Sequence, residues 1–523
     1  MRPNPSIVRD RCGEWARVAL LLLCLSNTAC MSLIRGTARG HDLAPNGMTR
    51  ADDGFRRALT VGAYAGAFAR AATPKAGAPD DPLLRSLYRG LTGYYAGEFD
   101  AAAAAFANAD ALAERRITKS VSRAAASVII SDGVLPYLPT RTEGLFLRYY
   151  AMHAHARAGR VENAVVEARR LGRLLEDVSG SLAPGERPLH ATMREAAGAV
   201  FEAAGERNDA LVSYRNAALL RGADRRDVDS IALREPGADS ATLIVFIESG
   251  FVAHRVDRGL TIGLDGERES PRDSTPGGPL LTSDSVITSP ANPERIVAQA
   301  LRLLDELPEG GVFVGPAYGQ PDSRGRYRVN RPMRIADGAR SFVRVAWPAL
   351  SRPASPVGPM TLLLGEAGVA ALQRPLGAGA DVTNALAEDV RRDRALVLAR
   401  AITRALAKGV VTDALRDKHG DWAGTLASLA GAALERADTR SWHLLPGSLS
   451  VVRLALPAGS HAPSLQVGTD VEALTVTLPP TVLAAGETRV VSTRIWRDGS
   501  AFTPPVSAGA AATGDRSERP SRW

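Results

Sequence analysis

A repeated spacing of small and aromatic residues is the feature that most constrains the fold of this chain. In two stretches a Gly lies seven residues before a second Gly, which is followed by Ala at five, an aromatic at nine and Ala at twelve residues. This spacing predicts helical hairpins: the first Gly and the alanines let two helices approach, the second Gly makes the turn, and the aromatic fills the space toward the next hairpin. The two sets are Gly90, Gly97, Ala102, Phe106, Ala109 and Gly198, Gly205, Ala210, Tyr214, Ala217.

A third stretch around Ala164 carries part of the same spacing. Hairpins of this kind resemble the tetratricopeptide repeat (TPR), whose period is about 34 residues. Here the equivalent alanines Ala102, Ala164 and Ala210 lie 62 and 46 residues apart, so the array is expected to be irregular, with insertions. The resemblance implies a TPR-like helical domain over residues 51–225, with a curved surface suited to binding a partner. An Ala-rich helical bundle without repeats is the alternative.

The hydrophobic period changes at about residue 241, where TLIVFI (242–247) forms an apolar, β-rich run. We therefore predict an α+β protein, with a helical N-terminal region followed by a mixed α/β region and a mainly antiparallel sheet. The expected segments are a β-rich domain (241–380) with a long loop (265–292), a helical segment (384–438), C-terminal strands (439–500) packing on the β-rich domain, and a disordered tail (503–523). Individual strands are predicted at 242–247, 252–256, 311–314, 326–329, 342–347, 361–364, 448–456, 471–478 and 488–496, and one helix at 296–307.

The N-terminus has the three-part layout of an export signal. Basic residues up to Arg17 precede the apolar run VALLLLCL (18–25), and small residues then lead to Cys30. Eight apolar residues rise only about 12 Å as a helix, against a hydrocarbon core of ~30 Å. Residues 1–29 are therefore predicted to be a signal peptide and not a permanent membrane span.

Ala29 followed by Cys30 resembles the lipobox of bacterial lipoproteins, although Asn27 departs from the Leu usual in that family. The resemblance implies a lipid such as palmitate on Cys30, a tether over residues 30–50, and a place in the cell envelope at the outer membrane, facing the periplasm. A soluble periplasmic protein and a cytoplasmic protein with a misread start are the alternatives. Cys12 and Cys24 leave with the signal, so the mature chain can form no internal disulfide.

The net charge of +8 does not indicate a nucleic-acid partner. The arginines are interleaved with acids, as in RRDR (391–394), and aromatic residues make up only 5% of the chain. A solvated surface is the preferred interpretation, with contact to anionic lipid or cell wall as the alternative. Arg400, Arg404 and Lys408 form a basic line at helical spacing that is interpreted in the same way, with an anionic partner as the alternative.

Catalytic motifs are not found. The chain has neither a Gly-Lys dipeptide for a P-loop nor a His-Glu dipeptide for the HExxH zinc motif. His153 and His155 point about 200° apart on a helix, and Ser249 lacks the flanking glycines of a nucleophile elbow. His443 and His461 are interpreted as structural. We predict no cofactor, no metal and no catalytic residue; the alternative is a periplasmic or cell-wall-modifying hydrolase with an unrecognised active site.

Several segments together resemble a family of uncharacterised bacterial TPR-like outer-membrane lipoproteins. The family resemblance implies a lipid anchor, a helical repeat region and a C-terminal mixed region, with no assigned activity. It also implies partners among other cell-envelope proteins, such as assembly or export lipoproteins of the curli-secretion type. The segments are VLPYLP (134–139), Tyr149-Tyr150, NAVVEARR (163–170), VFIESG (245–250), ARAITRA (399–405), DTRSW (438–442), LLP (444–446) and PAG (457–459).

The predicted function is a lipid-anchored envelope scaffold that binds other envelope proteins through its helical repeats. Tyr94, Tyr95, Arg148 and Glu167 lie beside the small packing residues and are the candidate partner-binding residues. Each of them could instead be a packing or surface residue. Trp442 is predicted to be buried where helix gives way to strand.

Overall fold

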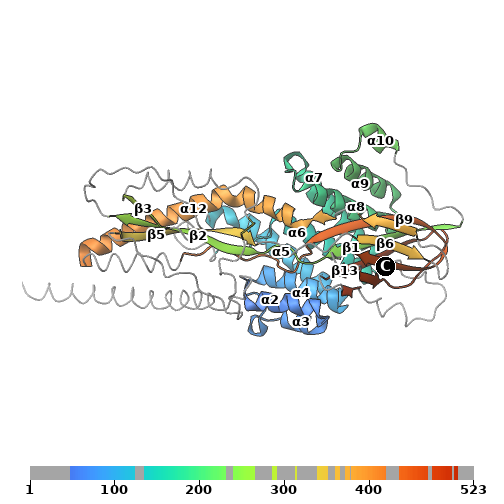
Figure 1. The fold of residues 1–523 in the computed structure, drawn as a ribbon, viewed down its shortest axis with the longest axis horizontal. Coiled ribbons are helices and arrows are strands. Elements are labelled where there is room, and N and C mark those ends of the chain that lie inside the picture. The colour runs from blue at the N-terminus through green and yellow to red at the C-terminus, as the bar shows by residue number, and fades with distance from the viewer. Residues whose placement is uncertain are drawn as a thin grey trace, which may run out of the picture.

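A computed structural model describes the helical region, the strands and their connections. The described residues are 48–123, 135–230, 239–265, 286–290, 313–314, 339–351, 360–365, 372–376, 379–419, 435–468, 474–496 and 500–503. The predicted signal peptide, Cys30, the tether up to residue 47, the helix at 296–307, the strand at 326–329 and the tail from 504 lie outside them. Figure 1 shows a body of helices and sheets, from which a narrow arm extends.

The first half of the described chain is helical, as predicted. Three pairs of sequential helices, α4 with α5, α6 with α7 and α8 with α9, make the main helix–helix contacts of the body. The helices are α2 (Arg50–Thr60), α3 (Tyr64–Arg70), α4 (Pro82–Ala96), α5 (Phe99–Arg123), α6 (Arg141–Arg157), α7 (Val161–Asp177), α8 (Arg187–Ala204), α9 (Arg207–Leu220) and α10 (Arg225–Ser230), with short 3-10 turns at Pro74–Ala76 and Ser179–Ser181.

The repeated glycines of the sequence are close-packing positions within the hairpins. A Cβ built on Gly90 of α4 would lie 2.4 Å from the ring of Phe106 on α5, and one built on Gly198 would lie 2.8 Å from Tyr214. The turn glycines Gly97 and Gly205 have φ values of 80° and 89°, a left-handed conformation that favours Gly. The predicted roles of both glycines in these two hairpins are confirmed.

The middle hairpin has large and small residues exchanged at the equivalent positions. Its turn glycine is Gly159, with φ 77°. Seven residues before it stands Met152 and nine after it Ala168, and both are fully buried. These positions hold a large side chain on the first helix and a small one on the second, where the other hairpins have Gly and an aromatic. Phe106 also stacks on Tyr150 of the next hairpin at 6.3 Å between ring centroids, so it fills the expected space.

The C-terminal half forms two packed sheets and a third in the arm, and most strand pairs are antiparallel, as predicted. The first sheet has the order β14-β13-β1-β9-β8, in which β1 pairs with β13 in parallel and with β9 antiparallel. The second sheet has the order β11-β10-β6-β7, with β12 also paired to β10. The strands are β1 (Ser240–Ser249), β6 (Met360–Gly365), β7 (Leu372–Leu376), β8 (Ala380–Asp381), β9 (Ser448–Pro457), β10 (Gly459–Val467), β11 (Leu474–Thr477), β12 (Thr481–Leu483), β13 (Thr488–Ile495) and β14 (Ala501–Phe502).

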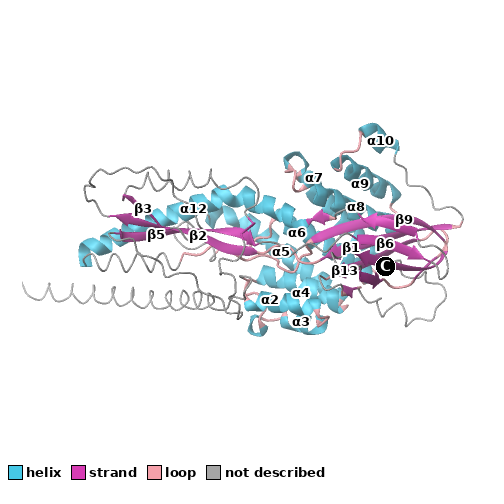
Figure 2. Ribbon diagram, in the orientation of Figure 1, coloured by secondary structure: helices cyan, strands magenta, loops and turns pink. Residues whose placement is uncertain are grey.

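The body therefore has three layers, with the first sheet between the helices and the second sheet (Figure 2). Alternate residues of β1 divide between two cores, because successive side chains of a strand point to opposite faces. Leu243, Val245 and Ile247 pack in the core between the two sheets, whereas Ile244 and Phe246 join the core shared with the helices. β1 is buried on both faces, which accounts for its uninterrupted apolar sequence.

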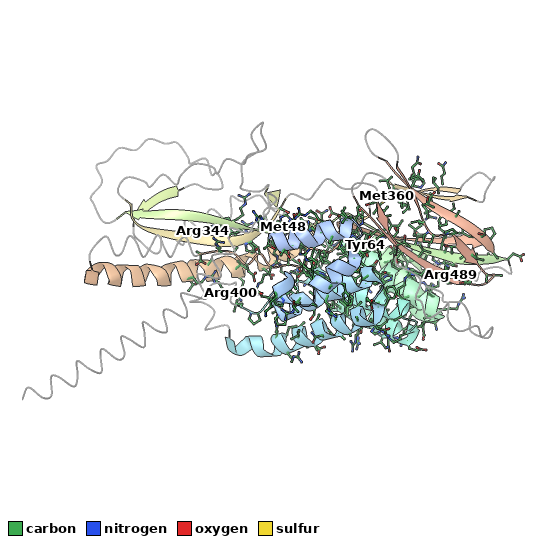
Figure 3. The ribbon with its side chains drawn as sticks, turned by 90° about the horizontal axis from the view of Figure 1, so that it is seen from below. Met48, Tyr64, Arg344, Met360, Arg400 and Arg489 are labelled. Atoms are coloured by element: carbon green, nitrogen blue, oxygen red, sulfur yellow. The ribbon has the colours of Figure 1, made fainter. Side chains whose placement is uncertain are left out.

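The arm consists of a long antiparallel strand pair with one helix beside it. β2 (Arg255–Asp265) pairs with β5 (Ala339–Ser351), β3 (Val286–Pro290) and β4 (Phe313–Val314) join them, and α12 (Val382–His419) packs on β5. Figure 3 shows Arg344 and Arg400 toward the arm, and Met360 and Arg489 toward the opposite end of the molecule. Among the described residues, no helix has the length and apolar content needed to cross a membrane.

Several predicted boundaries differ from the observed ones. β3 lies inside the predicted loop 265–292. Residues 252–254, expected in a strand, precede β2. Residues 435–438, expected to be helical, are not, and β10 was not predicted. β10 was missed because its sequence GSHAPSLQV is polar and contains Pro463, although pairing with β6 buries alternate residues.

Two side-chain predictions have clear outcomes. Trp442 is 1% exposed and packs on Phe106 and Tyr150, so its predicted burial is confirmed. The basic line on α12 is not simply a solvated face, because Arg404 is 1% exposed and its Nε donates a 3.0 Å hydrogen bond to Glu435. Glu435 lies outside α12, so the helical spacing of Arg400, Arg404 and Lys408 could not predict this contact.

Candidate functional site

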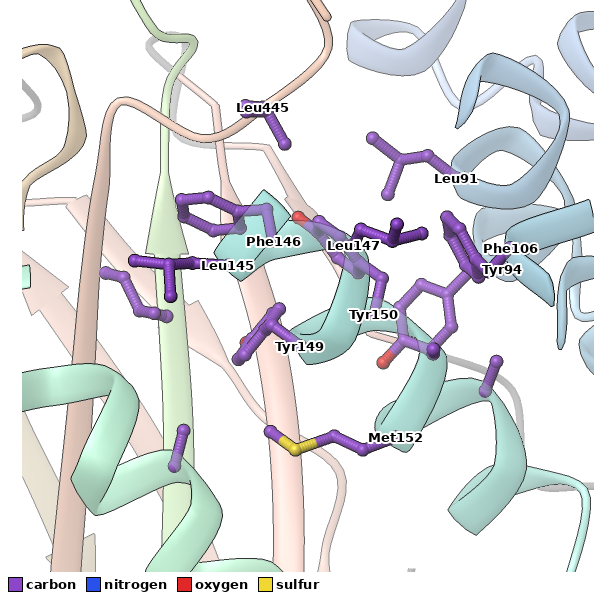
Figure 4. Close-up of a cluster of buried hydrophobic side chains, with 14 of the residues drawn as sticks. Leu91, Tyr94, Phe106, Leu145, Phe146, Leu147, Tyr149, Tyr150, Met152 and Leu445 are labelled. Carbon is purple, nitrogen blue, oxygen red and sulfur yellow. The ribbon is translucent and has the colours of Figure 1, made fainter. Parts of the chain in front are cut away.

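Two of the candidate partner-binding residues, Tyr94 and Tyr95, lie in the interior. They are 5% and 2% exposed, and both rings contact Phe502 of β14. Figure 4 shows Tyr94 and Phe106 pointing toward Tyr150 of α6 in this aromatic cluster. The expectation that these tyrosines contact a partner is corrected: in this structure they pack against the chain's own sheet.

The hydroxyl of Tyr95 belongs to a buried polar network centred on Glu248 of β1. Tyr150 donates a 2.9 Å hydrogen bond to the Glu248 carboxylate, and Tyr95 donates one of 3.3 Å. Arg494 of β13 lies 4.0 Å from the same carboxylate and donates to the Tyr95 hydroxyl at 2.6 Å. Burial raises the pKa of Glu248, while Arg494 and the hydroxyls of Tyr150, Tyr149 and Tyr95 act in the opposite direction.

Arg494 also ties together the segment that leads into β9. Its guanidinium donates to the carbonyls of Leu444, Leu445 and Gly250 at 2.9, 3.2 and 2.7 Å. Each charged group of the network is therefore satisfied by neighbours from the helices, from β1 or from this segment. The network is an internal joint between helices α4 and α6 and the first sheet.

Arg148 and Glu167 form a second cluster, between helices. Arg148 of α6 donates to Asp110 of α5 at 2.9 Å and to Glu167 of α7 at 3.1 Å, and Arg170 also pairs with Glu167 at 2.9 Å. Glu167 is 8% exposed. The cluster joins consecutive hairpins, so Arg148 and Glu167 have structural roles in place of the expected partner contact.

The histidines and the serine considered for chemistry are also built into the fold. His153 packs between Tyr149 and Phe246 at 4.5 and 4.6 Å, and burial, with the charge of Arg157, lowers its pKa to about 3. The Ser249 hydroxyl lies 2.5 Å from that of Ser448 in the neighbouring strand.

His443 and His461 lie close to polar groups of the fold. His443 Nδ1 lies 3.4 Å from Asp52, and His461 Nε2 lies 2.9 Å from the carbonyl oxygen of Pro457. Ser351 and His254 approach each other at 2.9 Å, but both are buried. The described part of the chain holds no group of three or more His, Cys, Asp or Glu side chains placed to bind a metal.

A cleft of about 370 Å³ lies between the last hairpin and the edges of both body sheets. One wall is formed by Thr192 and Glu195 of α8 with Tyr214 of α9, and the other by residues 374–376 of β7 and 449–453 of β9. Gly379 also lines the cleft, and a Cβ built on it would lie 2.5 Å from the hydroxyl of Ser450. The cleft is therefore where α8–α9, β7 and β9 meet, and each segment is distant from the others in sequence.

The charges of this cleft are unequally compensated. Arg221 donates to both oxygens of Glu195 at 2.9 and 2.7 Å, and Arg453 makes a similar paired contact with Glu202 at 2.8 and 2.7 Å. Arg374 is exposed and has no ion-pair partner among the residues that the structure describes. The cleft thus presents one uncompensated guanidinium, which suits a carboxylate or another anion.

No sequence pattern predicts this cleft. Its charged residues carry no local motif, and Arg374 stands in the unremarkable segment LQRPL. Comparisons with protein-family models, with curated proteins and with solved structures found no match to this chain. What the protein does is therefore inferred from its own residues.

Proposed function

We propose that this protein is a lipid-anchored scaffold of the bacterial cell envelope, which binds another envelope protein at the cleft between α8–α9 and strands β7 and β9. The observation that supports the proposal most is the cleft itself, with the exposed guanidinium of Arg374 beside apolar residues such as Leu376 and Val451. Interfaces of this kind combine an apolar centre with a few charged contacts that select the partner.

The hairpins α4–α5, α6–α7 and α8–α9 belong, in this proposal, to an irregular TPR-like array. Such arrays usually offer their curved inner face to a partner. Here Tyr149 of α6 packs on Phe246 of β1 at 6.1 Å between ring centroids, so the first sheet occupies that face. The partner is accordingly assigned to the cleft at the end of the array.

The place of the protein is proposed from its N-terminus. The apolar run and the Ala29-Cys30 pair support export, acylation of Cys30 and attachment to the outer membrane on the periplasmic side. The predicted tether, residues 30–50, would then separate the folded body from the membrane surface. Partners are expected among other envelope proteins, including assembly or export lipoproteins.

Affinity capture from gently solubilised envelopes tests the proposal with a matched pair of charge reversals. Arg374→Glu changes the exposed guanidinium of the cleft, whereas Arg173→Glu changes an exposed arginine on α7, away from it. The co-purifying envelope protein should fall severalfold with Arg374→Glu and stay at the wild-type level with Arg173→Glu. Equal capture by both variants would contradict the assignment of the cleft.

A further inference from the structure

Among the described residues, no strand pairs with the outer edge of β9 along most of its length. β1 pairs with β9 from Ser448 to Pro457, whereas β8 pairs with it only at Ser448 and Leu449. Within the described part of the chain no other strand pairs with β9, so from residue 450 onward its outer edge has no strand partner. Residues 450–453 of this open stretch line the cleft.

The strand register determines which backbone groups reach that edge. The amide of Ala458 donates to the carbonyl of Asp239 at 2.8 Å, in continuation of the β1–β9 register. Backbone N–H and C=O groups of an antiparallel strand point alternately to its two sides. The groups of Val451, Arg453 and Ala455 therefore point away from β1, toward the open edge. Pro457, the next residue of this set, has no N–H and ends the stretch.

A second sheet edge faces the same cleft. β7 is the last strand of the second sheet, and its residues 374–376 form part of the cleft wall. An exposed edge strand is a template for pairing with another chain, and proteins usually cover or blunt it. Here Pro375 blunts β7, because it cannot donate a backbone hydrogen bond, whereas β9 has ordinary residues from 451 to 456.

We infer that an extended segment of another protein adds as a strand to the outer edge of β9, with an acidic side chain paired to Arg374. The inference rests on the proposed function, since it names the kind of segment that occupies the cleft. Main-chain hydrogen bonds to Val451, Arg453 and Ala455 supply the affinity, as in other cases of strand addition, and the stretch of roughly 13 Å accommodates about five residues. The acidic requirement follows from Arg374, since Arg221 and Arg453 already have carboxylate partners.

A random dodecapeptide library displayed on phage, selected against the full mature protein in mild detergent, tests the inference. The selected peptides should carry Asp or Glu among β-branched residues. Bound peptide should slow deuterium exchange at the amides of Val451, Arg453 and Ala455, which strand pairing would protect. Dissociation constants of the synthetic peptides are then measured by fluorescence anisotropy.

Substitutions at Ala455 separate backbone pairing from side-chain contact. Ala455→Pro removes a backbone N–H that points to the open edge and places a proline ring there. The side chain of Ala455 is exposed, so the substitution does not disturb the core. Binding should weaken about tenfold with Ala455→Pro and stay unchanged with Ala455→Ser, which keeps the amide. Melting temperatures near that of the wild type show that both variants are folded.

Charge reversals test the acidic requirement. Arg374→Glu should weaken binding about fivefold at low salt, with a smaller loss at high salt, and Arg173→Glu should have no effect. The inference is overturned if the library yields no binding peptide, or if the peptides bind Ala455→Pro and Arg374→Glu as tightly as the wild type. Capture of an envelope protein that depends on Arg374 but not on Ala455 would keep the proposed function and overturn strand addition.

Discussion

Tyr150 on α6 donates a 2.9 Å hydrogen bond to the carboxylate of Glu248 on β1, and this contact joins the middle of the helical array to the central strand of the first sheet. The carboxylate is buried, and Arg494 of β13, a strand that pairs with β1, lies 4.0 Å away. The helices and the sheet consequently share one core and one polar network, and we expect them to unfold together.

Removal of Glu248 should destabilise both parts at once. Glu248→Ala leaves the buried guanidinium of Arg494 without its carboxylate, which typically costs about 3–5 kcal/mol. Denaturant unfolding followed by circular dichroism and by tryptophan fluorescence should show one shifted transition in both signals. Glu248→Gln, which keeps the shape of the side chain, should lose less. Two separate transitions, or an unchanged midpoint for Glu248→Ala, would contradict the shared core.

Two glycine substitutions should have opposite effects on stability. Gly90→Ala places a Cβ 2.4 Å from Phe106, and overpacking of this kind costs about 1–3 kcal/mol. Gly172→Ala on α7 meets no atom within 4 Å and should stabilise the helix by up to about 1 kcal/mol. Melting temperatures of the two variants check the pair. A Gly90→Ala protein as stable as Gly172→Ala would show that the hairpin is not tightly packed there.

Acid should weaken the folded state through His153. Burial and the charge of Arg157 lower its pKa from 6.5 to about 3, so the folded protein binds fewer protons than the unfolded chain between these values. The contribution of His153 to the free energy of unfolding should therefore be fully present above pH 6.5. The free energy of unfolding should fall as the pH drops toward 3. His190, with its pKa lowered to about 4 mainly by burial, contributes in the same direction.

Replacement of His153 isolates its share of the pH dependence. His153→Phe should flatten the loss of stability between pH 6.5 and 4, measured by denaturant titration at several pH values. His155→Gln, two residues along the same helix and only half-buried, should change the slope less. An unaltered slope in His153→Phe would mean that protonation of this ring does not oppose folding.

The lipid anchor gives a prediction at Cys30. Cys30→Ala should leave the signal uncleaved or release the protein into the soluble periplasm, because the acylated thiol is the proposed membrane attachment. Cell fractionation and the mass of the mature protein check this. Normal processing and continued membrane association of the Cys30→Ala protein would contradict acylation at that residue.

The local features of the fold could be predicted from the sequence because they depend on near neighbours. Gly97 and Gly205 mark the turns of two hairpins. Gly90 and Phe106 are 16 residues apart, and the hairpin that contains both brings them into contact. The apolar run at 242–247 predicts a buried strand. Each of these signals lies within one or two elements. The α+β class followed from the change of period alone.

The remainder depends on contacts between distant segments. The sequence around Tyr94 and Tyr95 does not show whether a partner or the chain's own sheet covers these side chains. They are covered by β14, which lies some 400 residues later in the chain. The parallel pairing of β1 with β13 leaves no local pattern, and neither does the cleft, whose walls come from α8–α9, β7 and β9. The partner-binding candidates were therefore misplaced, although the hairpins that carry them were predicted.

Photo-crosslinking in living cells tests whether an envelope protein occupies the cleft. A photoreactive amino acid replaces Leu376, in the cleft wall, in one strain, and Val166, which is 45% exposed on α7, in another. We expect illumination to crosslink the Leu376 variant to another envelope protein and to give no crosslink with the Val166 variant. An adduct at position 166 with none at position 376 would contradict the cleft as the binding site.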